Sequence, residues 1–225
     1  MSFRNNSPAG ESRRSFLKRT ALGAAGLAVV GSARSHAAVP GANNKVRAAI
    51  IGLKRRGLPL LGSFSKVPNV EVTWLCEVDS RQMEIGLEKA QEFLGYQPKT
   101  DTDMRRIVEQ PDVDAVFIAT PDHWHAYGTL IALQNGEHVY LEKPTSHNLA
   151  EDALLIQAEK AFPQLKIQVG TQQRSSVESN EIISEIHNGV IGNPYKAVAF
   201  YTNNRPRVPV PQVVPVPGFL DWELW

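Results

Sequence analysis

The chain has 225 residues and is nearly neutral, with 24 lysines and arginines against 23 aspartates and glutamates. A chain without a global basic excess gives no indication of nucleic-acid binding. Cys76 is the single cysteine, which excludes an internal disulfide framework and a Cys-x-x-Cys metal cluster, and its apolar surroundings predict a small buried side chain.

Residues 1–37 have the pattern of an export signal and not of a folded domain. Arg13-Arg14 precedes a small and apolar run at 21–30, and residues 35–37 offer small side chains at the positions that a signal peptidase reads. The run is about half of the roughly 20 residues that cross a bilayer, so we expect no stable membrane anchor. The paired arginines resemble a twin-arginine signal. We therefore expect the twin-arginine translocase to export the protein to the periplasm or another extracytoplasmic compartment, with a mature chain beginning near Ala38.

From Val46 onwards, segments with the patterns of strands and helices alternate along the chain. We expect strands at 46–51, 70–76, 115–119, 139–141 and 167–169, and helices at 58–65, 81–94, 101–109, 125–135 and 149–161. Ser80 is the expected N-cap of the second helix, and Gly136 is suited to a left-handed C-cap. This alternation is typical of an α/β fold, a doubly wound parallel (Rossmann) sheet, which we place at residues 38–170.

Beyond Gly170 the character of the sequence changes. We expect a helix at 177–187 and a single strong strand at 196–202, followed by a proline-rich tail that ends in Phe219, Trp222 and Trp225. A lone strand and an aromatic tail have nothing to pack on. We therefore interpret residues 171–225 as the beginning of a second domain that the sequence does not finish.

The turn after the first strand, Gly52-Leu53-Lys54-Arg55-Arg56-Gly57, partly matches a dinucleotide-binding fingerprint. The fingerprint has glycine at its first, third and sixth positions, and here Lys54 occupies the third, where the backbone approaches pyrophosphate. The cationic groups of Lys54, Arg55 and Arg56 offer contacts to phosphate oxygens instead. An ordinary strand-to-helix turn remains the alternative.

Glu77 ends the second expected strand. An acid at that position accepts hydrogen bonds from ribose hydroxyls and repels a 2′-phosphate, which favours NAD over NADP. A solvent-facing acid at a strand end is the alternative interpretation, and Arg81 nearby keeps NADP as the second choice of cofactor.

Two further polar runs follow later strands. His123 and His125 lie two residues apart, but without a third clustered ligand they are too few for a metal site. We therefore expect Thr120 and His125 to be hydrogen-bonding groups in a loop over a cofactor. In Glu142-Lys143-Pro144, the proline holds Lys143 extended at the carboxyl edge of the sheet, where ligands bind in α/β proteins. A surface ion pair that ends the strand is the alternative.

Together, Thr120-Pro121-Asp122 with His125, the run 142–144 and Gly170-Thr171-Gln172-Gln173-Arg174 resemble the Gfo/Idh/MocA oxidoreductases, the relatives of glucose–fructose oxidoreductase and inositol dehydrogenase. The resemblance covers 46–225 and is strongest to the exported branch with twin-arginine signals. It implies a Rossmann domain followed by a substrate and oligomerisation domain with an open, mostly antiparallel sheet. We accordingly expect a homo-oligomer of the full-length protein.

The resemblance also implies roles for the residues. The turn from Gly52 to Gly57 and Glu77 would hold the adenosine half of the cofactor, while Thr120, Pro121 and His125 would line the nicotinamide side. Glu142 and Lys143 would border nicotinamide and substrate, with Lys143 as the catalytic residue that bonds a substrate hydroxyl, and Gln172 and Arg174 would lie just beyond. Lys54 departs from the pattern, and the family's acid/base histidine belongs to a later segment that these residues do not include.

The expected function is an exported NAD(P)-dependent oxidoreductase that transfers hydride between nicotinamide and a sugar, polyol or related alcohol. A glycosidase of the same fold, which oxidises its sugar transiently with bound NAD, is the first alternative. A non-catalytic exported binding protein with a nucleotide site weakened by Lys54 is the second. With one wall of the substrate pocket, we expect the 225 residues to bind a dinucleotide without turnover.

Overall fold

A computed structural model describes residues 45–203, 206–207, 210 and 212–225, so the expected export signal lies outside the described residues. The chain forms two compact units. One contains residues 45–170 together with Phe219–Trp225, and the other contains Thr171–Gly218. No helix in the described ranges is long and apolar enough to cross a membrane.

The first unit is built on a six-stranded parallel sheet. Its strands are β1 (Val46–Ile51), β2 (Val70–Cys76), β3 (Lys99–Asp101), β4 (Ala115–Ile118), β5 (His138–Leu141) and β6 (Ile167–Val169). They lie in the order β3-β2-β1-β4-β5-β6, and every neighbouring pair is parallel. The chain thus runs outwards to β3 and returns to place β4 beside β1, which confirms the predicted doubly wound sheet.

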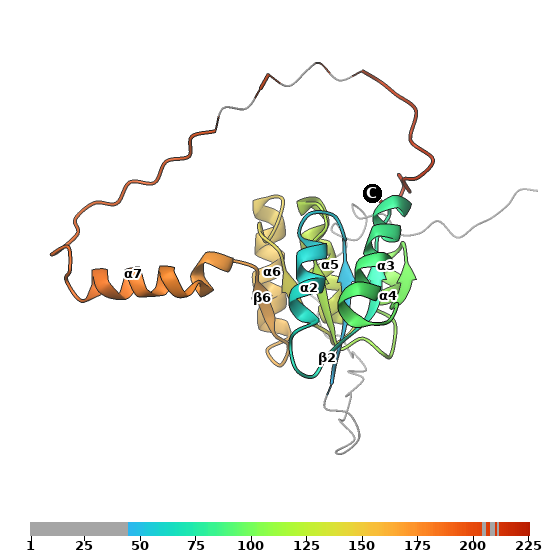
Figure 1. The fold of residues 1–225 in the computed structure, drawn as a ribbon, viewed down its shortest axis with the longest axis horizontal. Coiled ribbons are helices and arrows are strands. Elements are labelled where there is room, and N and C mark those ends of the chain that lie inside the picture. Colours follow the sequence, from blue (N-terminus) through green and yellow to red (C-terminus); the bar gives the residue numbers. More distant parts are fainter. Residues whose placement is uncertain (1–44, 204–205, 208–209, 211) are drawn as a thin grey trace, which may run out of the picture. The chain divides into compact units, whose positions relative to one another are not determined.

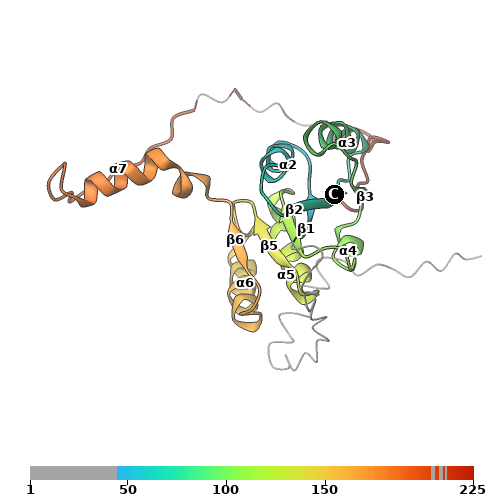
Figure 2. The same cartoon turned by 60° about the horizontal axis from the view of Figure 1, so that its bottom comes forward.

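Helices cover both faces of this sheet. On one face lie α2 (Gly57–Phe64) and α3 (Ser80–Leu94), and on the other lie α4 (Met104–Ile107), α5 (His125–Gln134) and α6 (Leu149–Ala161) (Figure 2). Successive strand residues alternate between the faces, so Ile50 packs with the first helix group and Ile51 with the second. Gly136, just after α5, is left-handed with φ 87°, as predicted.

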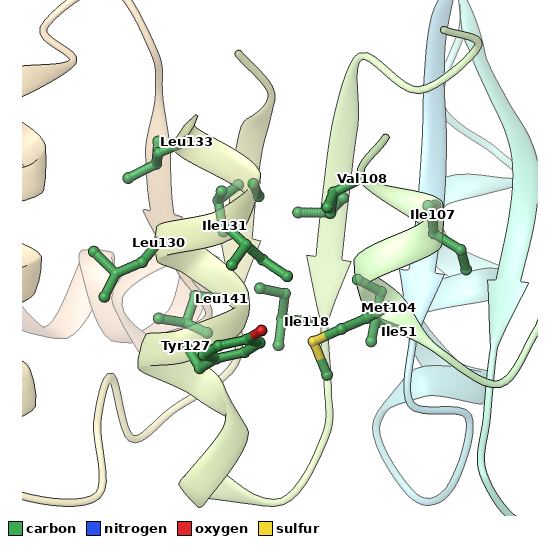
Figure 3. Packing of buried hydrophobic residues seen from close by; sticks show 14 of the residues in the cluster. Ile51, Met104, Ile107, Val108, Ile118, Tyr127, Leu130, Ile131, Leu133 and Leu141 are labelled. Atoms are coloured by element: carbon green, nitrogen blue, oxygen red, sulfur yellow. The ribbon is translucent and has the colours of Figure 1, made fainter. Parts of the chain in front are cut away.

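The larger of the two cores lies between the sheet and α4, α5 and α6. Ile51, Ile118 and Leu141, from three adjacent strands, meet Tyr127 and Leu130 of α5 (Figure 3). All four residues of β4 are buried, which is the reason for its uninterrupted apolar sequence. Cys76 is also buried, and burial raises the pKa of its thiol.

Two local predictions need correction. The helix expected at 101–109 is limited to α4. The strand β3 before it was not predicted, because its polar sequence Lys-Thr-Asp has no strand pattern. It is a strand only because it pairs with Trp74–Cys76 of β2. The N-cap of α3 is Asp79 and not Ser80. Asp79 is extended, and its carboxylate accepts the backbone N–H of Arg81.

The second unit contains a short 3₁₀ helix, η3 (Gln172–Ser175), and α7 (Val177–His187) (Figure 1). The bounds of α7 are those predicted. The strand predicted at 196–202 is wrong, because those residues form no regular structure and are exposed. A strand needs a neighbour for its backbone hydrogen bonds, and no described residue of this unit forms one.

The tail Phe219–Trp225 returns to the first unit. The N–H of Ser80 donates to the carbonyl of Phe219 (2.9 Å), and the N–H of Asp221 donates to the carbonyl of Val78 (3.0 Å). Asp79 and Leu220 form an antiparallel bridge between these two bonds. The expectation that the aromatic tail has nothing to pack on is therefore wrong, and the tail does not group with residues 171–218.

Candidate functional site

A cavity of about 340 Å³ lies at the carboxyl ends of four strands. It is bordered by Gly52 after β1, by Glu77 to Asp79 after β2, by Thr102 to Arg105 after β3, and by Ala119 to Pro121 and Trp124 after β4. β1 and β4 are the strands at which the chain order reverses. Ligands of open α/β sheets bind at this edge and at this reversal point.

The two glycines of the first turn are required by close backbone contacts. Gly52 has φ 86°, and a Cβ there would lie 2.8 Å from backbone atoms of Ala119 and Thr120. A Cβ on Gly57 would lie 1.9 Å from the Gly52 carbonyl oxygen. The turn is therefore packed tightly against β4 and against the start of α2.

Lys54, at the missing third glycine of the fingerprint, is exposed and borders the cavity. Gly52 and Arg55, with φ 86° and 51°, are the residues of the turn with positive φ, and Lys54 is not one of them, so the position of Lys54 does not need the conformational freedom of glycine. The backbone of this turn accommodates the lysine, and its ammonium group is available to the cavity. Arg55 is exposed but does not border the cavity.

Glu77 borders the cavity and also holds the turn in place. Its Oε2 accepts the N–H of Leu53 (2.8 Å), while its Oε1 accepts the N–H groups of Val78 (2.8 Å) and Asp79 (3.1 Å). A carboxylate offers about four acceptor positions. One position on Oε2 is thus left for a further donor, such as the ribose hydroxyl that the sequence analysis assigned to it.

Two of the cationic candidates are engaged within the protein. Arg81 donates to both oxygens of Asp79 (Nε 3.1 Å, Nη2 2.8 Å), which holds the pKa of Asp79 below its ordinary value, and its guanidinium lies 3.2 Å over the Phe219 ring. Arg56 donates through Nε to Oε1 of the buried Glu142 (3.1 Å). Arg56 therefore ties the first turn to the end of β5.

Thr120 provides an unsatisfied polar atom in the wall. Its Oγ1 is buried and has no hydrogen-bond partner among the described residues, and the residue borders the cavity together with Pro121. A buried hydroxyl without a partner is costly, and a polar ligand would satisfy it. This hydroxyl, the glycine turn and the free position on Glu77 fit a dinucleotide with ribose hydroxyls and phosphates.

His125 has a different place from the one predicted. It is 2% exposed, does not border the cavity, and its ring nitrogens face the carbonyls of Thr120 (Nε2, 3.0 Å) and Pro144 (Nδ1). Each ring nitrogen thus faces a backbone carbonyl and not the cavity. His125 holds the loop after β4 against the loop after β5 and positions both.

Glu142 and Lys143 follow β5, the next strand along the edge. Glu142 is buried, while Lys143 is exposed and precedes a cis bond to Pro144. Neither residue borders the cavity, whose lining stops at the end of β4. Gln172 and Arg174 are exposed on η3, in the second unit.

The contribution of the tail and of the residues after β3 was not predicted from the sequence. Phe219, Leu220, Trp222, Leu224 and Trp225 all border the cavity. The aromatic content of the tail was the one signal in the sequence, and it does not say which surface the tail meets. In the described part of the chain, no three His, Cys, Asp or Glu side chains are grouped to hold a metal ion.

Comparison with known proteins supports the assignment of this fold. The family described as "Oxidoreductase family, NAD-binding Rossmann fold" (GFO_IDH_MocA) matches residues 46–171. A glycosyl hydrolase family 109 protein of Saccharopolyspora erythraea is 27% identical over 202 residues, which cover 80% of this chain and 43% of that protein.

Solved structures give the same result. The myo-inositol 2-dehydrogenase of Lactobacillus plantarum is similar at 30% identity and a TM-score of 0.60, over 66% of this chain and 42% of that one. The scyllo-inositol dehydrogenase of Lactobacillus casei, with bound NAD(H) and scyllo-inositol, is similar at 25% identity and a TM-score of 0.60, over 66% and 43%. The chain thus spans less than half the length of these relatives. It belongs to the Gfo/Idh/MocA oxidoreductase family and contains that family's NAD-binding Rossmann fold.

Proposed function

We propose that the protein is an NAD-dependent oxidoreductase that transfers hydride between the nicotinamide and a carbinol carbon of a sugar, polyol or related alcohol. The observation that carries the proposal is the cavity at the sheet reversal point, with its glycine turn and the unpartnered hydroxyl of Thr120. The inositol dehydrogenases similar to this chain support the substrate class.

Different residues along the sheet edge would contact the adenosine half of the cofactor, the nicotinamide half and the substrate. Glu77 and Lys54 would hold the ribose and phosphates of the adenosine half, and Thr120 and Pro121 would lie along the cofactor towards β5. Bound nicotinamide supplies the hydride acceptor. Lys143, exposed at the end of β5, would donate a hydrogen bond to the substrate hydroxyl oxygen and so position it, while the family's acid/base histidine of a later segment would take the hydroxyl proton. The Arg56–Glu142 ion pair would fix the backbone that presents Lys143.

Replacement of Lys143 by alanine tests this assignment. The side chain is exposed, so Lys143→Ala should leave NAD binding and the unfolding temperature unchanged. In a protein that contains the complete substrate domain, it should reduce the rate of polyol oxidation about 100-fold or more, because loss of substrate orientation costs roughly that much. NAD binding is measured by calorimetric titration, and oxidation by NADH absorbance over a panel of inositols and sugars.

Lys160→Ala, on the exposed face of α6, is the matched control and should leave the rate unchanged. A wild-type protein that does not bind NAD would contradict the proposal. Equal rates of polyol oxidation for Lys143→Ala and wild type would show that Lys143 has no role in the reaction.

A second candidate function is an NAD-dependent glycosidase of the same fold. It is favoured by the glycosyl hydrolase family 109 protein, which is similar over 80% of this chain. Such an enzyme restores its cofactor in each cycle. Hydrolysis of an aryl glycoside with tightly bound NAD and no added acceptor would select this alternative, whereas stoichiometric NADH release would select the dehydrogenase.

We further propose that the protein is exported by the twin-arginine translocase. The support is the sequence of residues 1–37, with Arg13-Arg14 before an uncharged run. A dinucleotide-binding protein fits this route, since the pathway exports folded proteins with their cofactors.

A further inference from the structure

We propose that the tail Phe219–Trp225 is a cofactor-binding element that forms the outer wall of the adenosine end of the dinucleotide site. This rests on the proposed function in one respect, that NAD occupies the cavity. Five of the seven tail residues border that cavity: Phe219, Leu220, Trp222, Leu224 and Trp225.

The tail is fixed to the sheet edge at two places. Near its start, the hydrogen bonds of Phe219 with Ser80 and of Asp221 with Val78 attach it to the loop after β2. At Trp225, the backbone carbonyl accepts the indole N–H of Trp124 (2.6 Å) and lies 2.9 Å from Nε2 of His123. Trp124 and His123 follow β4, so the tail bridges the loops after β2 and β4, between which the cavity opens.

The position of the cavity along the sheet identifies the end of the cofactor. Its walls follow β1, β2, β3 and β4, and it includes Glu77, the acid at the ribose position. Glu142 and Lys143, which follow β5, do not border it. The start of the tail, which pairs with the loop after β2, therefore faces the adenosine half, and the tail reaches the loop after β4 only at Trp225.

The aromatic side chains suit contact with a purine. Trp222 and Trp225 stack on each other, with ring centroids 5.3 Å apart and an angle of 8° between planes, yet they are 54% and 45% exposed. Phe219 packs on the Arg81 guanidinium. The tail leaves the cavity of about 340 Å³ open between itself and the sheet, so it is a wall and not a plug.

The tail also bears on the choice between NAD and NADP. Arg81 is the cation nearest the ribose position in sequence, and it is held by Asp79 on one side and by Phe219 on the other. An arginine in this place accommodates a 2′-phosphate when it is available. The Phe219 contact keeps Arg81 on the rim, which adds to the effect of Glu77 in favouring NAD.

The test is calorimetric titration of the 225-residue protein with NAD, ADP-ribose and NADP. We expect Phe219→Ala and Trp225→Ala each to weaken NAD binding about tenfold, since an aromatic contact to a base is typically of that size. ADP-ribose should lose affinity by the same factor. Phe219→Ala should in addition narrow the ratio of NAD to NADP affinity. Phe219→Leu and Trp225→Leu, which keep apolar bulk, separate loss of stacking from loss of folding when unfolding temperatures are measured alongside.

Tyr195→Ala is the matched control, because Tyr195 is 98% exposed in the other unit, and its affinities should equal those of wild type. Wild-type affinity for NAD in the tail variants would show that the tail does not contact the cofactor, and tighter binding would show that it obstructs the site. Either result overturns the inference and leaves the proposed function unaffected. Loss of affinity for NAD but not for ADP-ribose would place the tail at the nicotinamide end and also overturn it. A wild-type protein that binds none of the three ligands would overturn both.

Discussion

At the end of β2, the Glu77 carboxylate accepts three backbone N–H groups, one of them from Leu53 in the glycine turn. The sequence predicts an acceptor for ribose hydroxyls at this position. The structure adds that the same side chain orders the turn, since the Leu53 N–H would otherwise lack this acceptor. Glu77 thus contributes both to the choice of cofactor and to the stability of the turn after β1.

We expect Glu77→Ser to weaken NAD binding about tenfold or more and to narrow its advantage over NADP, because a hydrogen bond to a charged acceptor is lost. The unfolding temperature should also fall, because three N–H groups lose their acceptor. Titration and thermal unfolding measure the two effects. Glu84→Ser, at an exposed site on α3, is the control. A wild-type preference for NADP would contradict the assignment.

Glu137, between α5 and β5, is 2% exposed, and both its carboxylate oxygens lack partners within the described structure. Burial, with a smaller contribution from the Asp114 charge, raises the pKa of Glu137 from about 4.5 to about 9. The folded protein therefore keeps a proton that the unfolded chain loses above about pH 4.5. The stability that this proton provides is complete below that pH and is lost as the pH rises towards about 9.

We expect Glu137→Gln to remove this dependence, since the amide does not titrate. The free energy of unfolding of wild type should fall by roughly 1 kcal/mol per pH unit between about pH 5 and 8 from this group, and the variant should be more stable at pH 8. Denaturant unfolding at several pH values measures the slope. Glu84→Gln should keep the wild-type pH dependence of the free energy of unfolding. If that of Glu137→Gln is as steep as in wild type, the raised pKa of Glu137 is contradicted.

At the scale of elements, the first turn joins β1, β4 and α2 through contacts that leave no space for a side chain at Gly57. We expect Gly57→Ala to abolish measurable NAD binding and to destabilise the protein by about 2 kcal/mol or more, since backbone must move. Gly218→Ala is the same chemical change where nothing lies within 4 Å, and it should be neutral within about 0.5 kcal/mol. Both are measured by titration and denaturant unfolding, and equal stability of the two variants would contradict the close packing.

Elements with a strong local pattern were predicted closely. The bounds of β1, β2, β6, α6 and α7 are those expected from the sequence. β3 was missed and the strand at 196–202 was wrong, and both errors have one cause. A strand exists through its neighbour, and Lys99–Asp101 has one in β2 despite a polar sequence, while the apolar run at 196–202 has none in the described structure.

For the whole molecule, export is predicted from residues 1–37 alone. Replacement of Arg13 and Arg14 by lysine should leave an uncleaved protein in the cytoplasm, because the arginine pair is what the translocase recognises. Cell fractionation with N-terminal sequencing measures the location and the cleavage of the protein. Arg34→Lys, outside the arginine pair, is the control and should be exported like wild type. Mature protein beginning near Ala38 outside the inner membrane of the double-lysine strain would contradict the twin-arginine route.

The sequence by itself determined the class of sheet, most of its strands and helices, and the family. Those properties depend on patterns within short segments: an apolar run such as Ala115–Ile118, a glycine turn after a strand, and Glu142-Lys143-Pro144 at a strand end. Each pattern reports how a segment is buried or capped by its immediate neighbours, and such patterns can be recognised without knowing the path of the chain.

Only the tertiary structure decided which side chains share a surface. It placed His125 between two carbonyls and away from the cavity, paired Arg56 with Glu142, and brought Phe219 onto Arg81. These contacts join residues up to 138 positions apart (219 − 81). No local pattern encodes them, because the return of the tail to the sheet depends on the path of the whole backbone.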